Sequence, residues 1–413
     1  MTAMIPTGAP VPQAWDRRGL PAWTYRSPAL LALERERLFL THWQIAGHEA
    51  DLPAPGDWLA FDMLGERAVV VRGQDGALRA FHNVCRHRGS RLVDGAQGQC
   101  RGALVCPFHG WVYDLDGRLR GAAQPGTFDA LDRDAFGLRP VEMEVVHGFL
   151  LLRFRPGPQP SAAALLAPYD ALLSAHRARD VLPVRAWTDT APVNWKSVRD
   201  VDNEAYHVPL AHPALNELYG RDYREVYLDH GLHLSAATFG DRPGRLWSVR
   251  RYVALAPEPA WLPEGLRRSW LYLGLFPNAV IVLTPEGVSY YQDLPVTPRE
   301  TRLAGRLYRR PHEDRPTRLA RYLQGRIDRG TSAEDRQLSV WSDESMLSSS
   351  FESFHLSDLE WGLRRHHDGL RRLMPVMDLA HAPPEADVAR IDDDLIYDRA
   401  DAAQDEARQG RTP

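Results

Sequence analysis

Hydrophobic and polar positions follow one pattern before Trp43 and another after it. Before it, the run SPALLALERERLFLTHW spaces its apolar residues as one face of a helix does, with Ser27 placed to cap the helix and Pro28 in its first turn. After it come short runs such as DWLAFDML, RAVVVRG, ALRAFHN and VVHGFLLLRFR, which are rich in β-branched and aromatic residues and separated by Gly, Asp and Pro. These patterns predict a helical segment over residues 1–42 and a small antiparallel β domain over residues 43–155.

The second half of the chain mixes both patterns. PGPQPSAAALLAP looks like a linker that leads into a helix. Strands followed by helices indicate an α+β domain, which we place at residues 156–385. Residues 386–413 are polar and acidic without a core face, and we expect this tail to be frayed. The expected elements are a helix over 196–220, strands near 230–240, 247–256, 269–284, 288–295 and 302–309, and helices from 313 to 378.

Composition narrows the class of protein. A chain of 413 residues exceeds the usual size of one hydrophobic core, which favours two domains. A net charge of −4 gives no electrostatic reason to expect nucleic acid, and no run of about 18 apolar residues or charged leader suggests a membrane or secretion. We therefore expect a cytoplasmic protein that binds neither nucleic acid nor membranes. The Arg-, Ala-, Gly- and Pro-rich amino-acid usage indicates a bacterial source. Three cysteines are a poor basis for disulfides and favour metal binding.

The first candidate metal site is Cys-x-His, followed after eighteen residues by Cys-x-x-His, inside the β-rich segment. Its residues are Cys85, His87, Cys106 and His109. Two thiolates on one iron and two imidazoles on the other suit a [2Fe-2S] cluster of raised reduction potential. Gly89 and Gly110 are placed for tight loop turns, and Trp111 and Tyr113 for shielding the cluster and hydrogen bonding near it. The alternative is a structural zinc site. We expect Cys100, between the loops, to be a surface or packing thiol.

The second candidate site lies in the run NWKSVRDVDNEAYHVPLAH. His207 and His212 are five residues apart, too far for one helical face unless the helix breaks, and Pro209 supplies a break. Glu204 precedes the first histidine by three residues. Two histidines and one carboxylate on one face of Fe(II) leave positions open for oxygen, so the run predicts a mononuclear iron site.

Taken together, these motifs resemble the Rieske non-haem iron oxygenases, whose loops read Cys-x-His-Arg-Gly and Cys-Pro-aromatic-His-Gly-Trp and whose iron motif follows an Asn-Trp-Lys triplet. The resemblance implies that His207 and His212 bind the iron. It also implies that Glu204 is a bridging carboxylate toward a cluster histidine of the neighbouring subunit, with Asp202 as the alternative. In SAEDRQLSVWSDES, the resemblance to relatives that carry an acidic pair followed eight residues later by Gln implies Asp335 as the third iron ligand, with Asp343 as the alternative.

The same resemblance implies an N-terminal antiparallel β Rieske domain joined to a helix-grip catalytic domain, in which helices cover a curved antiparallel sheet. It implies a [2Fe-2S] cluster, mononuclear Fe(II), O2, a small organic substrate and a homotrimer. This sequence contains no Gly-x-Gly-x-x-Gly unit between a strand and a helix, so electrons from NAD(P)H should arrive through a separate reductase or ferredoxin.

The sequence leaves three readings of the substrate and activity open. Glu204, where most relatives have Asp, is similar to the branch that oxidises quaternary ammonium compounds, in which hydroxylation leads to demethylation. Ring hydroxylation or dealkylation of an aromatic acid, paired to an arginine, is the alternative, and a non-catalytic electron carrier is the third reading. Some of the aromatic residues of the catalytic half could line a pocket, although most such residues belong to cores; they are Tyr206, Trp247, Tyr252, Trp261, Trp270, Tyr272, Phe276, Tyr290 and Tyr291.

Overall fold

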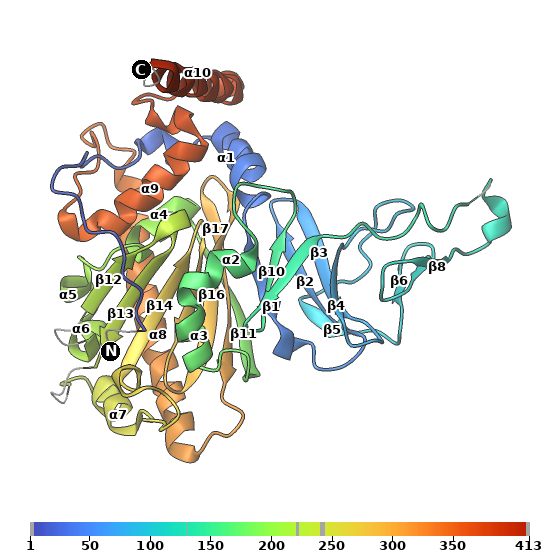
Figure 1. Ribbon diagram of the computed structural model, residues 1–413, viewed down its shortest axis with the longest axis horizontal. Helices are drawn as coiled ribbons and strands as arrows, with labels where there is room; N and C mark the ends of the chain where they lie inside the picture. Colours follow the sequence, from blue (N-terminus) through green and yellow to red (C-terminus); the bar gives the residue numbers. More distant parts are fainter. Residues whose placement is uncertain (1–3, 130, 220–222, 240–243, 410–413) are drawn as a thin grey trace. The chain divides into compact units, whose positions relative to one another are not determined.

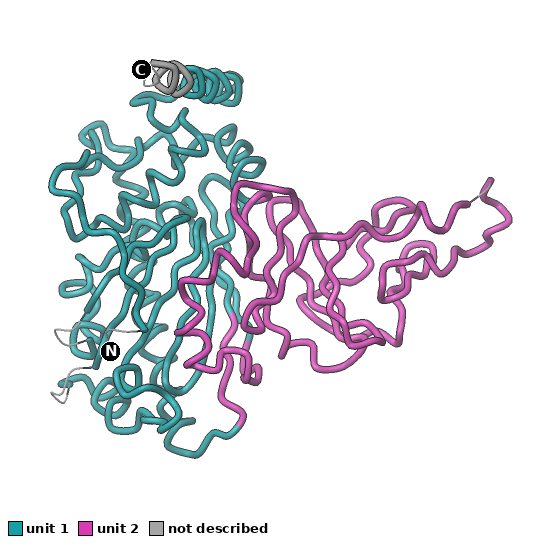
Figure 2. The backbone as a smooth tube through the Cα atoms, in the orientation of Figure 1, with its two compact units in different colours: residues 1–39, 186–305, 312–413 teal, residues 40–185, 306–311 magenta. Residues whose placement is uncertain are grey.

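The computed structural model describes residues 4–129, 131–219, 223–239 and 244–409 (Figure 1). The chain divides into two compact units (Figure 2). Unit 1 comprises residues 1–39, 186–305 and 312–413, and unit 2 comprises residues 40–185 and 306–311. Each unit therefore combines segments that are far apart in the sequence. Within the described residues, no helix combines the length and the apolar character that crossing a membrane would take.

Unit 2 is built from short antiparallel strands, as the sequence predicts. Its hydrophobic cluster includes Trp58, Phe81 and Trp111 together with both loop cysteines, Cys85 and Cys106. Two short helices, α2 (Ala162–Leu166) and α3 (Asp170–Ala175), follow the strands. The strands form three sheets, in the orders β1 (Gln44–His48), β10 (Phe149–Arg153), β9 (Glu142–Val146); β4 (Leu78–His82), β3 (Glu66–Arg72), β2 (Asp57–Met63), β5 (Gln97–Gln99); and β6 (Leu104–Val105), β7 (Val112–Tyr113), β8 (Leu119–Gly121).

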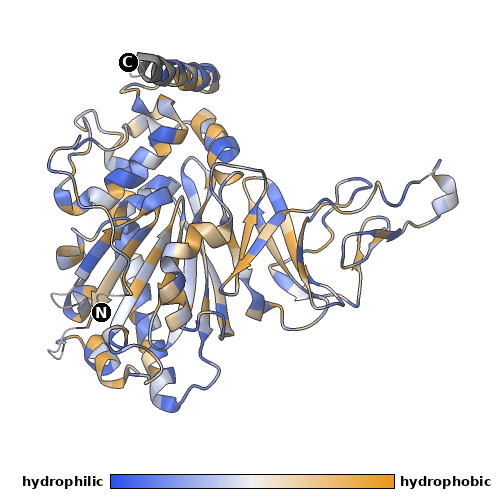
Figure 3. Ribbon diagram, in the orientation of Figure 1, coloured by the Kyte–Doolittle hydropathy of each residue, from blue (hydrophilic) through white to orange (hydrophobic). Residues whose placement is uncertain are grey.

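Strand β10 shows why these runs become strands. Its residues FLLLR are all buried, and the strand is hydrogen-bonded on both edges, to β1 and to β9. A strand with neighbours on both edges and both faces covered reads as an unbroken apolar run, and Figure 3 shows β10 in the orange of hydrophobic residues.

Unit 1 is organised around one seven-stranded sheet, whose order is β11-β17-β16-β15-β14-β13-β12. Strands β12 to β16 pair as antiparallel neighbours. The arrangement confirms the α+β class. The strands are β11 (Leu182–Ala191), β12 (Tyr223–Tyr227), β13 (His233–Thr238), β14 (Ser269–Leu275), β15 (Ala279–Leu283), β16 (Gly287–Thr297) and β17 (Glu300–Arg309).

Helices cover this sheet and position the candidate iron residues. Helix α4 contacts β16, α6 contacts β13, and α8 contacts α4, α6 and α7. The expected N-terminal helix is present, with the Ser27 hydroxyl accepting from the backbone N of Leu30 at 3.0 Å. The helices are α1 (Pro28–Glu34), α4 (Trp195–Asp202), α5 (Val208–Ala211), α6 (Pro213–Tyr219), α7 (Trp247–Leu255), α8 (Arg315–Ser345), α9 (Trp361–Leu373) and α10 (Val388–Gln409).

Some of the expected elements are wrong. Residues 247–256 form helix α7 instead of a strand, because the buried residues of this run, Val249 and Tyr252, are three apart and share a helix face. The expected strand over 269–284 is two strands, β14 and β15, separated by Phe276 to Asn278. Strands β11 and β12 lie outside the expected strand positions, and both carry charged residues within the strand.

The expectation of a frayed tail after residue 385 is also wrong. Residues 388–409 form helix α10, and its Val388 and Asp392 are fully buried. The Asp392 carboxylate accepts from the backbone N of Val376 at 2.8 Å and forms an ion pair with Arg37. Because Val388 and Asp392 are four residues apart, they lie on one face and dock an otherwise polar helix.

Candidate metal centres

The two Cys-x-His loops of unit 2 have the same backbone hydrogen bonds. Gly89 N donates to Cys85 O at 3.0 Å, and Gly110 N donates to Cys106 O at 3.0 Å. Gly89 and Gly110 have φ of +75° and +67°, the left-handed region in which glycine is favoured. The two loops therefore share the same turn from cysteine to glycine, while the histidine stands two residues after Cys85 in the first loop and three residues after Cys106 in the second.

The four side chains of these loops come together. The Cys85 and Cys106 side chains are 2% exposed, and the His87 and His109 rings lie 4.7 Å apart between centroids. The Nδ1 atoms of both histidines are buried and have no hydrogen-bond partner among the described residues. Burial raises the pKa of Cys85, so its thiolate needs a nearby positive charge. Two buried sulfurs and two unpaired imidazole nitrogens fit a metal cluster between the loops.

The two aromatic residues expected beside the cluster site, Trp111 and Tyr113, contact its candidate ligands. Trp111 stacks on His87 with 5.0 Å between ring centroids and 5° between planes. The Tyr113 hydroxyl lies 3.3 Å from Cys85 Sγ and accepts from the backbone N of Arg86 at 3.0 Å. The third cysteine, Cys100, donates instead to the carbonyl of Gly56 at 3.3 Å.

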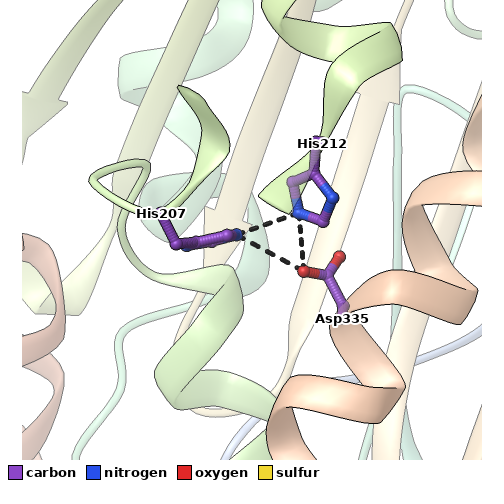
Figure 4. A group of neighbouring side chains, drawn as sticks. All are labelled: His207, His212 and Asp335. Atoms are coloured by element: carbon purple, nitrogen blue, oxygen red, sulfur yellow. Dashed lines mark hydrogen bonds and ion pairs between the residues drawn. The ribbon is translucent and has the colours of Figure 1, made fainter. Parts of the chain in front are cut away.

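The second centre brings His207, His212 and Asp335 together (Figure 4). His207 Nε2 lies 3.0 Å from His212 Nε2, and Asp335 Oδ1 lies 3.4 Å and 2.8 Å from these two nitrogens. A first-row metal ion with bonds of about 2.1 Å at right angles places neighbouring donor atoms about 3.0 Å apart. The three atoms are therefore spaced as the three ligands on one face of an octahedral ion.

The local fold explains how these residues meet. Helix α4 ends at Asp202, and α5 begins again at Val208, so His207 precedes a short helix and His212 follows it. Asp335 comes from the middle of the long helix α8. The sequence motif contains only the two histidines. The fold brings in the carboxylate of Asp335, which lies 123 residues after His212 in the chain.

Comparisons with known proteins match both parts of the chain that carry these candidate centres. The model of the Rieske [2Fe-2S] domain matches residues 42–132, and that of the ring hydroxylating alpha subunit (catalytic domain) matches residues 178–376. The carnitine monooxygenase oxygenase subunit of Escherichia coli (strain K12) is 32% identical over 275 residues, which cover 66% of this chain and 68% of that protein. This chain belongs to the Rieske non-haem iron oxygenases.

One further relative and one solved structure are similar to this chain. The glycine betaine monooxygenase oxygenase subunit of Chromohalobacter salexigens is 39% identical over 196 residues, which cover 48% of this chain but only 43% of that protein. A solved quaternary ammonium Rieske monooxygenase superposes with a TM-score of 0.73 at 21% identity, covering 86% of this chain and 94% of that one. This second likeness shows a shared fold.

Family membership fixes the cofactor types of this Rieske oxygenase. The domain matched over residues 42–132 is a [2Fe-2S] domain, which confirms the cluster expectation over the zinc alternative. The catalytic domain matched over 178–376 is that of the mononuclear iron oxygenases. The residues described above fit both groups.

Each histidine of the candidate iron site has its own carboxylate partner on the far side of the ring. Glu204 Oε1 contacts His207 Nδ1, and Glu334 Oε2 lies 2.8 Å from His212 Nδ1. Such carboxylates fix the tautomer and ring orientation of metal-binding histidines, so that Nε2 points to the metal. Glu334 is a functional candidate that the sequence reasoning missed. Its only sequence signal is its place beside Asp335 in an acidic pair.

The charges around the triad favour a cation at its centre. Burial alone lowers the pKa of His207, but its hydrogen bonds to Asp335 and Glu204 raise that pKa to about 10. Burial would raise the pKa of Asp335, but hydrogen bonds from His207 and His212 lower it. The raised pKa of His207 reflects the negative charge of its carboxylate partners, and the lowered pKa of Asp335 reflects the histidines that stabilise its charged form. A divalent metal ion bound by all three residues offsets the carboxylate charge in place of protons on the histidines.

The alternative acids lie elsewhere. Asp343, the alternative third ligand, is 1% exposed, forms an ion pair of 3.0 Å with Arg26 and accepts from the Ser197 hydroxyl. Asp202, the alternative bridging residue, pairs with Arg199 and accepts from the Tyr291 hydroxyl at 2.7 Å. Neither carboxylate belongs to the triad.

The aromatic residues proposed for a pocket have mixed environments. Tyr252 and Trp270 are fully buried, and Trp270 Nε1 donates to the Tyr252 hydroxyl at 2.6 Å, as expected of core residues. Tyr206 and Trp247 are more than half exposed. Tyr272 differs, because its hydroxyl lies 2.8 Å from that of Tyr219 at the end of α6, the helix that follows His212.

Proposed function

We propose that this chain is a terminal oxygenase that hydroxylates an N-methyl group of a small quaternary ammonium compound. The observation that carries the proposal is the triad of His207, His212 and Asp335, with donor atoms spaced for one face of an iron ion. One oxygen atom of O2 enters the C–H bond and the other leaves as water, with two electrons and two protons consumed. The carbinol then loses formaldehyde and a proton, and a tertiary amine remains.

The chain's own residues have distinct roles in this proposal. When bound, the iron activates O2 and the cluster supplies electrons one at a time. His207, His212 and Asp335 hold the iron, while Cys85, His87, Cys106 and His109 hold the cluster. Glu204 keeps the proton on Nδ1 of His207 and serves as the bridging carboxylate toward the cluster of a neighbouring subunit.

This electron path requires partners. We propose a homotrimer in the cytoplasm, in which each iron receives electrons through Glu204 from the cluster of the adjacent copy. A separate reductase or ferredoxin reloads the cluster with electrons that originate in NAD(P)H.

One observation favours an ammonium substrate over an aromatic acid. The names of the relatives given above specify glycine betaine and carnitine.

Product analysis tests the proposal. The iron-loaded protein is reduced without oxygen, then mixed with O2 and either glycine betaine, carnitine, choline or a panel of aromatic acids. Formaldehyde and a demethylated amine, detected by mass spectrometry, are the expected products. A hydroxylated ring would replace the proposed substrate class, and cluster oxidation without any product would support an electron carrier instead.

A further inference from the structure

Glu225, on strand β12, sits among tyrosines on the sheet of unit 1. The hydroxyl of Tyr223 donates to its Oε1 at 2.8 Å, and the hydroxyl of Tyr227 donates to its Oε2. The three residues alternate along β12, so their side chains share one face of the sheet. A carboxylate therefore lies between two tyrosines on one strand.

Further aromatic residues extend this group across the sheet. The Tyr219 ring stacks on that of Tyr223 with 6.0 Å between centroids, and its hydroxyl meets that of Tyr272. Glu225 on β12 pairs with Ser235 on β13, and Ser235 pairs with Tyr272 on β14. Because directly paired residues project on the same face of a sheet, the side chains of Tyr272 and Glu225 share one face. We call Glu225, Tyr219, Tyr223, Tyr227 and Tyr272 the tyrosine box.

The tyrosine box has a negative charge that no cationic side chain neutralises. Among the described residues, Glu225 has no arginine or lysine within ion-pair distance, and its one basic neighbour is His233, at 3.9 Å. Burial lowers the pKa of His233 to about 4, so this ring is uncharged near neutral pH. Arg365 lies over the ring of Tyr227 and donates to the Leu228 carbonyl. A largely buried carboxylate without a cationic partner is costly to keep charged, and a cationic ligand offsets that cost.

The tyrosine box also lies next to the proposed iron site. Tyr219 ends α6, which begins directly after His212. Burial raises the pKa of Glu225, and the charge of Glu204, the partner of His207, raises it further. The charge of Asp335 likewise acts on Tyr219, so the box lies within electrostatic range of the triad.

We infer that the tyrosine box binds the ammonium group of the substrate, with Glu225 as its counter-charge and the tyrosine rings as its walls. A quaternary ammonium group has no N–H to donate, so only charge and aromatic faces can recognise it. A tyrosine that donates its hydroxyl hydrogen to a carboxylate has a more electron-rich ring, which strengthens its attraction for a cation. The inference rests on the proposed substrate class and adds the residues that select it.

Binding measurements on the loaded protein without oxygen test the inference. Choline is compared with its neutral carbon isostere, in which a tert-butyl group replaces the trimethylammonium group, by calorimetry. The wild type should bind choline roughly tenfold to hundredfold more tightly than the isostere. Glu225→Gln should remove most of this preference, whereas Glu225→Asp, which keeps the charge, should retain it. Glu258→Gln, in an acid paired with Arg268 on the surface, is the matched control.

The outcomes separate the inference from the proposed function. If the wild type demethylates ammonium compounds but Glu225→Gln keeps the full preference for the cation, the inference is wrong and the proposed function stands. Equal binding of choline and its isostere by the wild type overturns the inference even if the variant does not fold. If the wild type neither binds nor oxidises any ammonium compound, both are wrong. A purely structural Glu225 would lower the unfolding temperature of the Gln variant and leave the preference unchanged.

Discussion

Replacing Glu334 by Gln is expected to weaken iron binding at the mononuclear site. Glu334 Oε2 lies 2.8 Å from Nδ1 of His212, and the same histidine presents Nε2 to Asp335 at 2.8 Å. The glutamine keeps the size of the side chain but loses the charge that polarises the imidazole and fixes its tautomer. His212 should then be a poorer and less well oriented ligand.

The expected loss is tenfold to hundredfold in iron affinity, which corresponds to about 1.4 to 2.8 kcal/mol, as is typical when such a carboxylate is removed. The assay is a titration of iron-free protein with Fe(II) in competition with a chromophoric chelator, without oxygen. The cluster, held by other residues, provides an internal control through its visible spectrum. Glu344→Gln, an exposed acid on the same helix, is the matched variant and should bind iron as the wild type does.

Equal iron affinity in Glu334→Gln and wild type would refute the reasoning, because it would show that His212 is oriented without its carboxylate. Loss of affinity in Glu344→Gln as well would assign the effect to the overall charge of α8 instead of to the contact.

The remaining predictions concern the other sites. His207→Ala should abolish substrate oxidation and leave the cluster's visible spectrum intact, and loss of both would mean that the two sites are misassigned. Tyr113→Phe should lower the reduction potential of the cluster by roughly 20–65 mV, the equivalent of one hydrogen bond to a sulfur; an unchanged potential in a redox titration would exclude that role. Asp392→Ala should reduce the free energy of unfolding by roughly 1–3 kcal/mol, since it leaves the Val376 N–H without its partner. A denaturation midpoint equal to that of the wild type would show that docking of α10 adds no stability.

The sequence predicts best those site residues whose chemical type and close spacing along the chain both indicate the same site. Cys85, His87, Cys106 and His109 lie in two short loops whose glycines and aromatic flanks are visible in the sequence, and the structure gathers all four. His207 and His212 also lie close in sequence, but the expected break at Pro209 is wrong, because Pro209 lies in the first turn of the short helix α5 and the two histidines flank that helix.

The sequence does not identify site residues whose role depends on contacts with residues far away in the chain. It offers Asp335 and Asp343 on one helix, and only the fold shows that the latter faces Arg26 while the former meets the histidines. Glu334 carries no local signal because neighbouring residues on a helix point in different directions. Glu225 was missed for a related reason: a charged residue in the middle of β12 weakens the strand pattern, although its side chain faces the interior side of the sheet.

The paired loops around Cys85 and Cys106 have a consequence for how damage would spread through the proposed cluster site. In the proposed ligand set each loop contributes one sulfur and one nitrogen, so each iron would take one ligand from each loop. A defect in either loop would then remove one protein ligand from both irons at once, and we expect it to weaken the whole cluster instead of a single iron.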